Sequence, residues 1–117
     1  MTKLPFSDAV RSGETLYVSG RLGLDPATRK PPEDPADEVR FLLNDVRAVL
    51  AAVEMTMNEL VMVTIFAPDV AHFATFNAVY VTYFDGPLPA RAFIGSGPLL
   101  FGCRFEVTAI AMAREER

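Results

Sequence analysis

The chain has 117 residues, which is long enough for one domain with a buried core and too short for two ordinary domains. Its net charge is −4 and its basic residues form no run, so we expect no nucleic-acid partner. One cysteine and one histidine exclude an intrachain disulfide and a Cys/His metal cluster, so we expect no metal site of that kind.

No apolar run reaches the roughly 18 residues that a membrane span needs, and the first residues lack the apolar core of a signal peptide. We therefore expect a cytoplasmic protein without a membrane partner. Half of the residues are hydrophobic, and a chain this short can bury only about two-thirds of its unfolded surface. The excess favours apolar surface that other subunits cover, with a very large monomeric core as the alternative.

The first elements expected in chain order are strands at 9–11 and 15–20, joined as a β-hairpin through Ser12-Gly13-Glu14. The loop at 25–35 contains four prolines. Asp34 followed by Pro35 is typical of a helix start. The helix beyond it has apolar residues three and four positions apart on one face: Val39, Leu42, Leu43, Val46, Val49, Leu50 and Val53.

The apolar run at 60–66 predicts a central strand covered on both faces. Asp69 predicts the cap of a second helix, whose apolar face is almost entirely aromatic. Two further strands are expected at 88–95 and 104–113.

This order predicts an α+β fold in a single domain over 1–117, an open mixed β-sheet with both helices on one face. The face of the sheet that the helices do not cover must then be buried by other contacts. We expect it to present side chains such as Val61, Val63, Phe105 and Val107, and to be packed in a trimer or dimer.

The last quarter of the chain places two charges in apolar surroundings. Arg91 stands among Ala90, Ala92 and Phe93, where its guanidinium suits the capture of a small carboxylate or, more simply, a structural ion pair with Glu106 or Asp85.

Glu106 faces away from its neighbours in the strand. It is either a carboxylate that positions or deprotonates water in a cleft, or an exposed residue of an edge strand.

Other polar residues have simpler interpretations. Asn77, on the aromatic face of the second helix, either bonds the backbone of a neighbouring loop, which we prefer, or touches a ligand. Ser19-Gly20 at a strand end indicates a bulge or a binding lip. His72 is expected to cap its helix or to face solvent, and Cys103 to be a small packing residue.

Several blocks of sequence, in their order and spacing, match the pattern of a known protein family. They are Pro5–Val10, Leu16–Pro26, Asn44, Phe73–Tyr80 with Tyr83 and Phe84, Pro89–Arg91 and Phe105–Ala111. Together they resemble the Rid family, also called the YjgF or reactive intermediate deaminase family.

The resemblance implies a chorismate-mutase-like fold, a homotrimer with clefts between subunits, and hydrolysis of 2-imino or enamine acids to 2-keto acids and ammonia. By position, Arg91 matches the arginine that holds the substrate carboxylate and Glu106 the glutamate that places the attacking water. Ser19, Asn77, Phe6 and Phe93 match positions that line the cleft.

This chain departs from the family pattern at three positions. Members with deaminase activity usually have tyrosine at Phe6, glutamine at Arg21 and cysteine at Phe93. These departures imply a change in substrate range, in rate or in activity itself, although the presence of Arg91 argues against a wholly inactive site. They also favour the alternative function, a non-enzymatic trimer that binds small carboxylates or acts as an interaction module.

Overall fold

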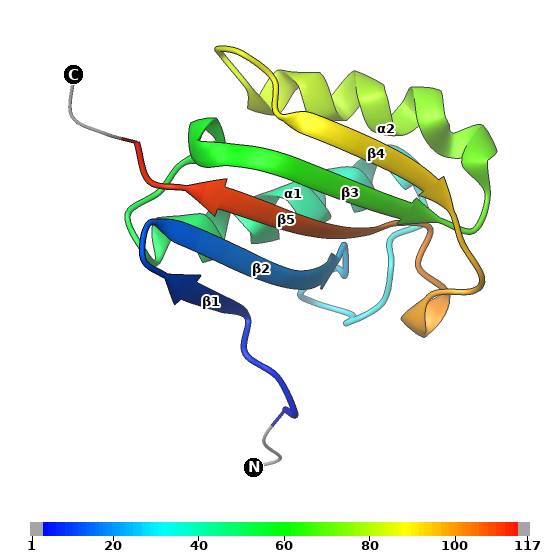
Figure 1. Ribbon diagram of the computed structural model, residues 1–117. Coiled ribbons are helices and arrows are strands. Elements are labelled where there is room, and N and C mark those ends of the chain that lie inside the picture. Colours follow the sequence, from blue (N-terminus) through cyan, green and yellow to red (C-terminus); the bar gives the residue numbers. More distant parts are fainter. Residues whose placement is uncertain (1–3, 115–117) are drawn as a thin grey trace.

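A computed structural model describes residues 4–114. It has a five-stranded mixed sheet in the order β1-β2-β5-β3-β4 (Figure 1). All neighbouring strands are antiparallel except β3 and β4, which are parallel and joined through α2. The elements are β1 (Ala9–Ser12), β2 (Thr15–Leu22), α1 (Pro35–Ala51), β3 (Leu60–Ala67), α2 (Phe73–Tyr80), β4 (Ala90–Gly95) and β5 (Glu106–Met112).

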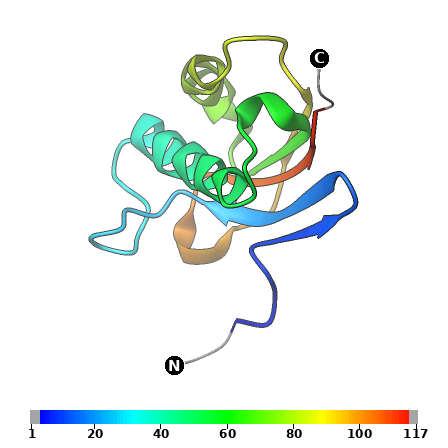
Figure 2. The ribbon, with the colours of Figure 1, turned by 90° about the vertical axis from the view of Figure 1, so that its left-hand side faces the viewer.

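Both helices cover the same face of the sheet, as the sequence predicts (Figure 2). The core lies between that face and the apolar sides of α1 and α2. Its most deeply buried side chains are Leu16, Val39, Leu42, Leu43, Val46, Leu50, Val63, Ile65, Phe76, Phe105 and Val107.

Local sequence explains where the first elements begin and end. Gly13, at φ 61°, forms the tight turn between β1 and β2, where a side chain would be strained. Asp34 caps α1 by accepting a hydrogen bond from the Ala36 N–H at 3.0 Å, and Pro35 occupies the first turn. Both predictions are confirmed.

The open face of the sheet carries different residues from those expected. Val63, Phe105 and Val107 point under the helices and are almost fully buried. The open face is instead lined by Tyr17, Met62, Thr64, Thr108 and Ile110. Within residues 4–114, the helices cover the run in β3 on one face only. The prediction of which alternate residues face the open side is wrong for Val63, Phe105 and Val107. An uninterrupted apolar run does not reveal which alternate residues point inward.

The second helix also begins later than the sequence suggests. Asp69 caps a short 3-10 turn at Val70–His72, where its side chain accepts from the Ala71 N–H at 2.9 Å. His72, at the N-cap of α2, makes no side-chain capping bond and packs edge-on against Phe105.

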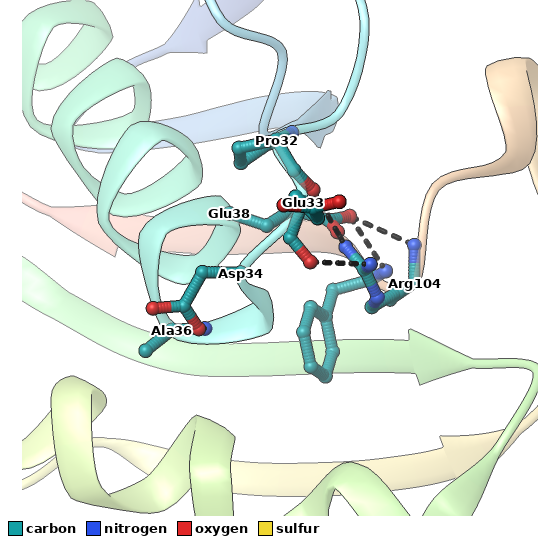
Figure 3. A network of polar contacts seen from close by, with 7 residues as sticks. Pro32, Glu33, Asp34, Ala36, Glu38 and Arg104 are labelled. Atoms are coloured by element: carbon teal, nitrogen blue, oxygen red, sulfur yellow. Dashed lines mark hydrogen bonds and ion pairs between the residues drawn. The ribbon is translucent and has the colours of Figure 1, made fainter.

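A buried ion pair ties the start of β5 to α1 (Figure 3). The Glu38 side chain is fully buried. Its Oε1 pairs with Nη1 of Arg104 at 2.7 Å, and its Oε2 accepts from the backbone N–H groups of Arg104 and Phe105 at 2.8 and 3.3 Å. The Arg104 guanidinium also donates to the carbonyls of Pro32 and Glu33. This network fixes the backbone immediately before Glu106.

Over residues 4–114, the structure contains no helix with the length and apolar character required to span a membrane.

Candidate functional site

Arg91 lies on β4, at the edge of the sheet, and points toward the helix-covered face. It is in register with Val63 of β3, whose side chain is buried beneath the helices. Residues in register on adjacent strands share a face, so the fold directs Arg91 toward α2.

Aromatic rings surround the Arg91 guanidinium. Its Cζ lies 5.0 Å from the ring centroid of Tyr80, 5.6 Å from Phe73, 5.9 Å from Phe93 and 6.0 Å from Phe76. Phe93 in turn packs edge-on against Phe73 and Phe76. The ring faces partly offset the positive charge, but they accept none of the guanidinium's directed hydrogen bonds.

Within residues 4–114, Arg91 forms neither an ion pair nor a hydrogen bond. The simpler expectation, a structural pair with Glu106 or Asp85, is therefore not met there. The guanidinium keeps its planar set of donors available, and that set matches a carboxylate in two parallel hydrogen bonds.

Two buried polar atoms on the same side of α2 find no hydrogen-bond partner among residues 4–114. They are the Asn77 side-chain oxygen and the Tyr80 hydroxyl. The preferred expectation for Asn77, bonding to a loop backbone, is not met by its oxygen. Burial raises the pKa of Tyr80 to about 12, although the nearby Arg91 charge opposes the shift, so the phenol stays protonated at neutral pH.

Glu106 lies on the opposite face of the sheet. It begins β5 in register with Phe66, one position out of phase with the inward-pointing Ile65. Its carboxylate lies directly over Gly20 of β2, where any side chain on residue 20 would place its Cβ against Oε2. The β2 register shifts between Val18 and Arg21, so the expected bulge is present, and Gly20 leaves the space that the carboxylate occupies.

One chain therefore forms two separate clusters of the expected site residues. Arg91 and Phe93 lie together beneath α2, the helix that carries Asn77, whereas Glu106 lies across the sheet beside the Ser19-Gly20 bulge. Arg91 and Glu106 point to opposite faces of the sheet, and their strands, β4 and β5, lie on either side of β3.

Ser19 fixes the segment that carries Phe6. Its backbone N–H donates to the Asp8 carbonyl at 2.9 Å, and its hydroxyl donates to the Ser7 carbonyl. Phe6 itself is 55% exposed and lines a cavity of about 730 Å³ between this segment, the end of β2 and α1. In this chain Ser19 holds the backbone, and Phe6 presents an apolar ring.

Arg21 is held by two carboxylates. It pairs with Asp45 of α1 and with Asp8, the latter at 3.0 Å. Burial works against the cation, but these two partners outweigh it and raise the pKa of Arg21. The Arg21 charge is thus neutralised locally.

Cys103 is buried, as expected of a packing residue. Burial, together with the Glu38 and Glu106 carboxylates, raises the pKa of its thiol to about 11, which disfavours the nucleophilic thiolate. Over residues 4–114, no three His, Cys, Asp or Glu side chains converge in a way that would hold a metal ion.

Sequence reasoning named Phe93 but missed Phe73, Phe76 and Tyr80 as neighbours of Arg91. The spacing of Phe73, Phe76 and Tyr80 places them on one helix face. Only the pairing of β4 with β3 brings Arg91 beneath that face.

Comparison with known proteins gives consistent matches. The family model for endoribonuclease L-PSP matches residues 1–113. A mouse protein named 2-iminobutanoate/2-iminopropanoate deaminase is 38% identical over 109 residues, covering 92% of this chain and 81% of the mouse protein. Among solved structures, the YjgF gene product of E. coli has 31% identity and a TM-score of 0.88, covering 94% of this chain and 89% of that one. E. coli TdcF with bound serine has 28% identity and a TM-score of 0.89, with coverages of 97% and 91%.

Proposed function

The chain belongs to the endoribonuclease L-PSP family, the Rid or YjgF group that its sequence resembles, and we propose that it hydrolyses reactive 2-imino and enamine acids to 2-keto acids and ammonia. The observation that carries the proposal is the Arg91 guanidinium, surrounded by rings and without a polar partner over residues 4–114. Relatives named as imine deaminases support the reaction class.

In the proposed reaction Arg91 binds the substrate carboxylate through two hydrogen bonds. Water adds to the carbon of the protonated C=N bond to give a carbinolamine. The C–N bond then breaks, nitrogen leaves as ammonia, and the water oxygen becomes the keto oxygen. The imine carbon is already electrophilic, so positioning and desolvation supply most of the acceleration, and the scheme needs no metal or organic cofactor.

Glu106 orients the attacking water in this scheme. Because Arg91 and Glu106 lie on opposite faces of one sheet, we propose that each catalytic cleft combines Arg91 of one copy with Glu106 of another, in a homotrimer. Ser19 and Phe6 accompany Glu106, and Asn77 and Phe93 accompany Arg91. The partly apolar open face around Met62 and Ile110 supports burial against further copies.

The assay generates 2-imino acids with an amino-acid oxidase and traps the remaining imine with semicarbazide. Wild type should reduce the trapped imine, and Arg91→Ala should abolish the effect. The matched control is Arg47→Ala, since Arg47 also lies 5.0 Å from a tyrosine centroid, that of Tyr83, but has Asn44 as a hydrogen-bond partner. Wild type that never accelerates imine loss, across small and aromatic imines, would disprove the deaminase.

Subunit mixing tests the shared cleft. Arg91→Ala and Glu106→Gln proteins, each inactive alone, should regain activity after they are unfolded together and refolded, because mixed trimers contain intact clefts. Light scattering should give three times the chain mass of 12.8 kDa. Absence of any recovery in verified mixed trimers would place both residues in clefts that are not shared.

The second candidate function is a non-enzymatic trimer that binds small carboxylates. Phe93 favours it, because its ring packs against Phe73 and Phe76 near Arg91. It predicts that 2-keto acids bind in an Arg91-dependent way without imine turnover. RNA is a poor substrate candidate, since the net charge is −4.

A further inference from the structure

Two polar side chains of α2, Asn77 and Tyr80, have no role in carboxylate binding by Arg91 alone. The Tyr80 side chain is only 3% exposed, and its hydroxyl has no hydrogen-bond partner in the part of the chain that the structure describes. The buried Asn77 oxygen also lacks one. A buried polar group without a partner costs about 1–3 kcal/mol, so the free protein carries an unfavourable arrangement at this place.

The two unpaired side chains both belong to α2, and one of them, Tyr80, contacts Arg91 through its ring. Asn77 and Tyr80 are three residues apart in α2 and therefore lie on one side of the helix. The Tyr80 ring is the aromatic neighbour nearest to the Arg91 guanidinium, at 5.0 Å. Arg91 offers donors, the Asn77 oxygen accepts, and the Tyr80 hydroxyl does either.

One class of molecule satisfies all three groups at once. It carries a carboxylate next to a carbon that bears an N–H group, as a 2-imino or enamine acid does. Its carboxylate can accept from Arg91 and from Tyr80, and its adjacent N–H can donate to the Asn77 oxygen. A simple monocarboxylate would leave the Asn77 oxygen unpaired.

We propose that Tyr80 is a further substrate-binding residue, whose hydroxyl donates a hydrogen bond to the substrate carboxylate beside Arg91. This inference rests on the proposed function for the identity of the substrate. The phenol is suited to the role because burial keeps it protonated, so it remains a donor throughout the neutral range.

Tyr80→Phe removes only the hydroxyl, and three readouts separate binding from structure. Affinity for 2-ketobutyrate, measured by calorimetry, should fall about 10- to 100-fold, as expected for loss of a hydrogen bond to a charged group. KM for the imine should rise by a similar factor, with a smaller change in kcat. The melting temperature of the ligand-free variant should be unchanged or higher, because an unpaired buried group has been removed.

Tyr83→Phe is the matched control. The Tyr83 hydroxyl donates to the Asn44 side-chain oxygen at 2.8 Å. Its removal should lower the melting temperature by roughly 2–8 °C and leave binding of 2-ketobutyrate unchanged.

The outcomes distinguish the two proposals. If wild type hydrolyses imines and Tyr80→Phe binds and turns over like wild type, the role of Tyr80 is wrong and the deaminase stands. Lower stability of Tyr80→Phe with unchanged binding also overturns it, in favour of a structural hydroxyl. Tyr80-dependent binding without any hydrolysis supports Tyr80 and rejects the deaminase. Wild type that neither binds nor hydrolyses rejects both.

Discussion

Replacing Glu38 by alanine should be among the most damaging single changes to this fold. The substitution removes three hydrogen bonds, to the Arg104 guanidinium and to the N–H groups of Arg104 and Phe105. Phe105 is fully buried, so its N–H is left without a partner. Each stranded group costs about 1–3 kcal/mol, and removal of one member of a buried pair typically costs about 3–5 kcal/mol. We expect a loss of about 3–5 kcal/mol in the free energy of unfolding.

Glu38→Gln should cost less, about 1–2 kcal/mol. Its carbonyl can still accept from the two backbone N–H groups, while its amide nitrogen would face the Arg104 guanidinium. Asp37→Ala is the control, because the neighbouring Asp37 pairs with Arg40 at the surface, where both side chains are about half exposed. Such pairs contribute at most about 1 kcal/mol.

Urea unfolding at pH 7 would measure all three variants. The expected order of destabilisation is Glu38→Ala, then Glu38→Gln, then Asp37→Ala. A loss below about 1 kcal/mol for Glu38→Ala would refute the reasoning, because it would mean that water replaces the carboxylate at no cost. Equal losses for the alanine and glutamine variants would instead show that the Arg104 ion pair carries the whole effect.

Two further predictions concern the site. Gly20→Ala places a Cβ against Glu106 Oε2, which lies at the end of a flexible side chain. We therefore expect kcat to fall about 10- to 100-fold with little change in the urea midpoint. Gly23→Ala is the control, because its Cβ would collide with the Glu38 backbone carbonyl and should lower stability instead. Unchanged kcat in folded Gly20→Ala would exclude Glu106 from the reaction. The Tyr80 hydroxyl has a pKa of about 12 in the folded chain and about 10 in the unfolded chain. The free energy of unfolding should therefore fall as the pH rises from 10 to 12, by up to about 2–3 kcal/mol. The fall should be smaller in Tyr80→Phe, which lacks this hydroxyl. Equal losses in both proteins between pH 9 and 12 would contradict this assignment.

The elements with strong local signals are predictable from sequence. The apolar period of α1, the Asp34 cap and the Gly13 turn each depend on residues close together in the chain. The family resemblance is equally readable, because it depends on the order and spacing of short blocks. The mixed sheet with two helices on one face follows from the order of the elements.

Features that depend on strand pairing are not predictable in the same way. The sequence pattern favours the open face for Val63, although Val63 is buried beneath the helices, on the face that it shares with Arg91. From the sequence, Arg91 and Glu106 look like two members of one site. The sequence does not reveal that their side chains point to opposite faces of the sheet. A shift of one position reverses the face of every side chain in a strand.

The position of β5 has a consequence for how the chain is made. The last strand of the sequence lies in the interior of the sheet, where it pairs Ala111 with both Leu16 and Leu60. Until residues 106–112 leave the ribosome, β2 and β3 each present an unpaired edge, and such edges promote aggregation. The same strand delivers Glu106. Synthesis therefore completes the sheet and supplies this carboxylate in one late event, and a chain cut short before β5 would lack both.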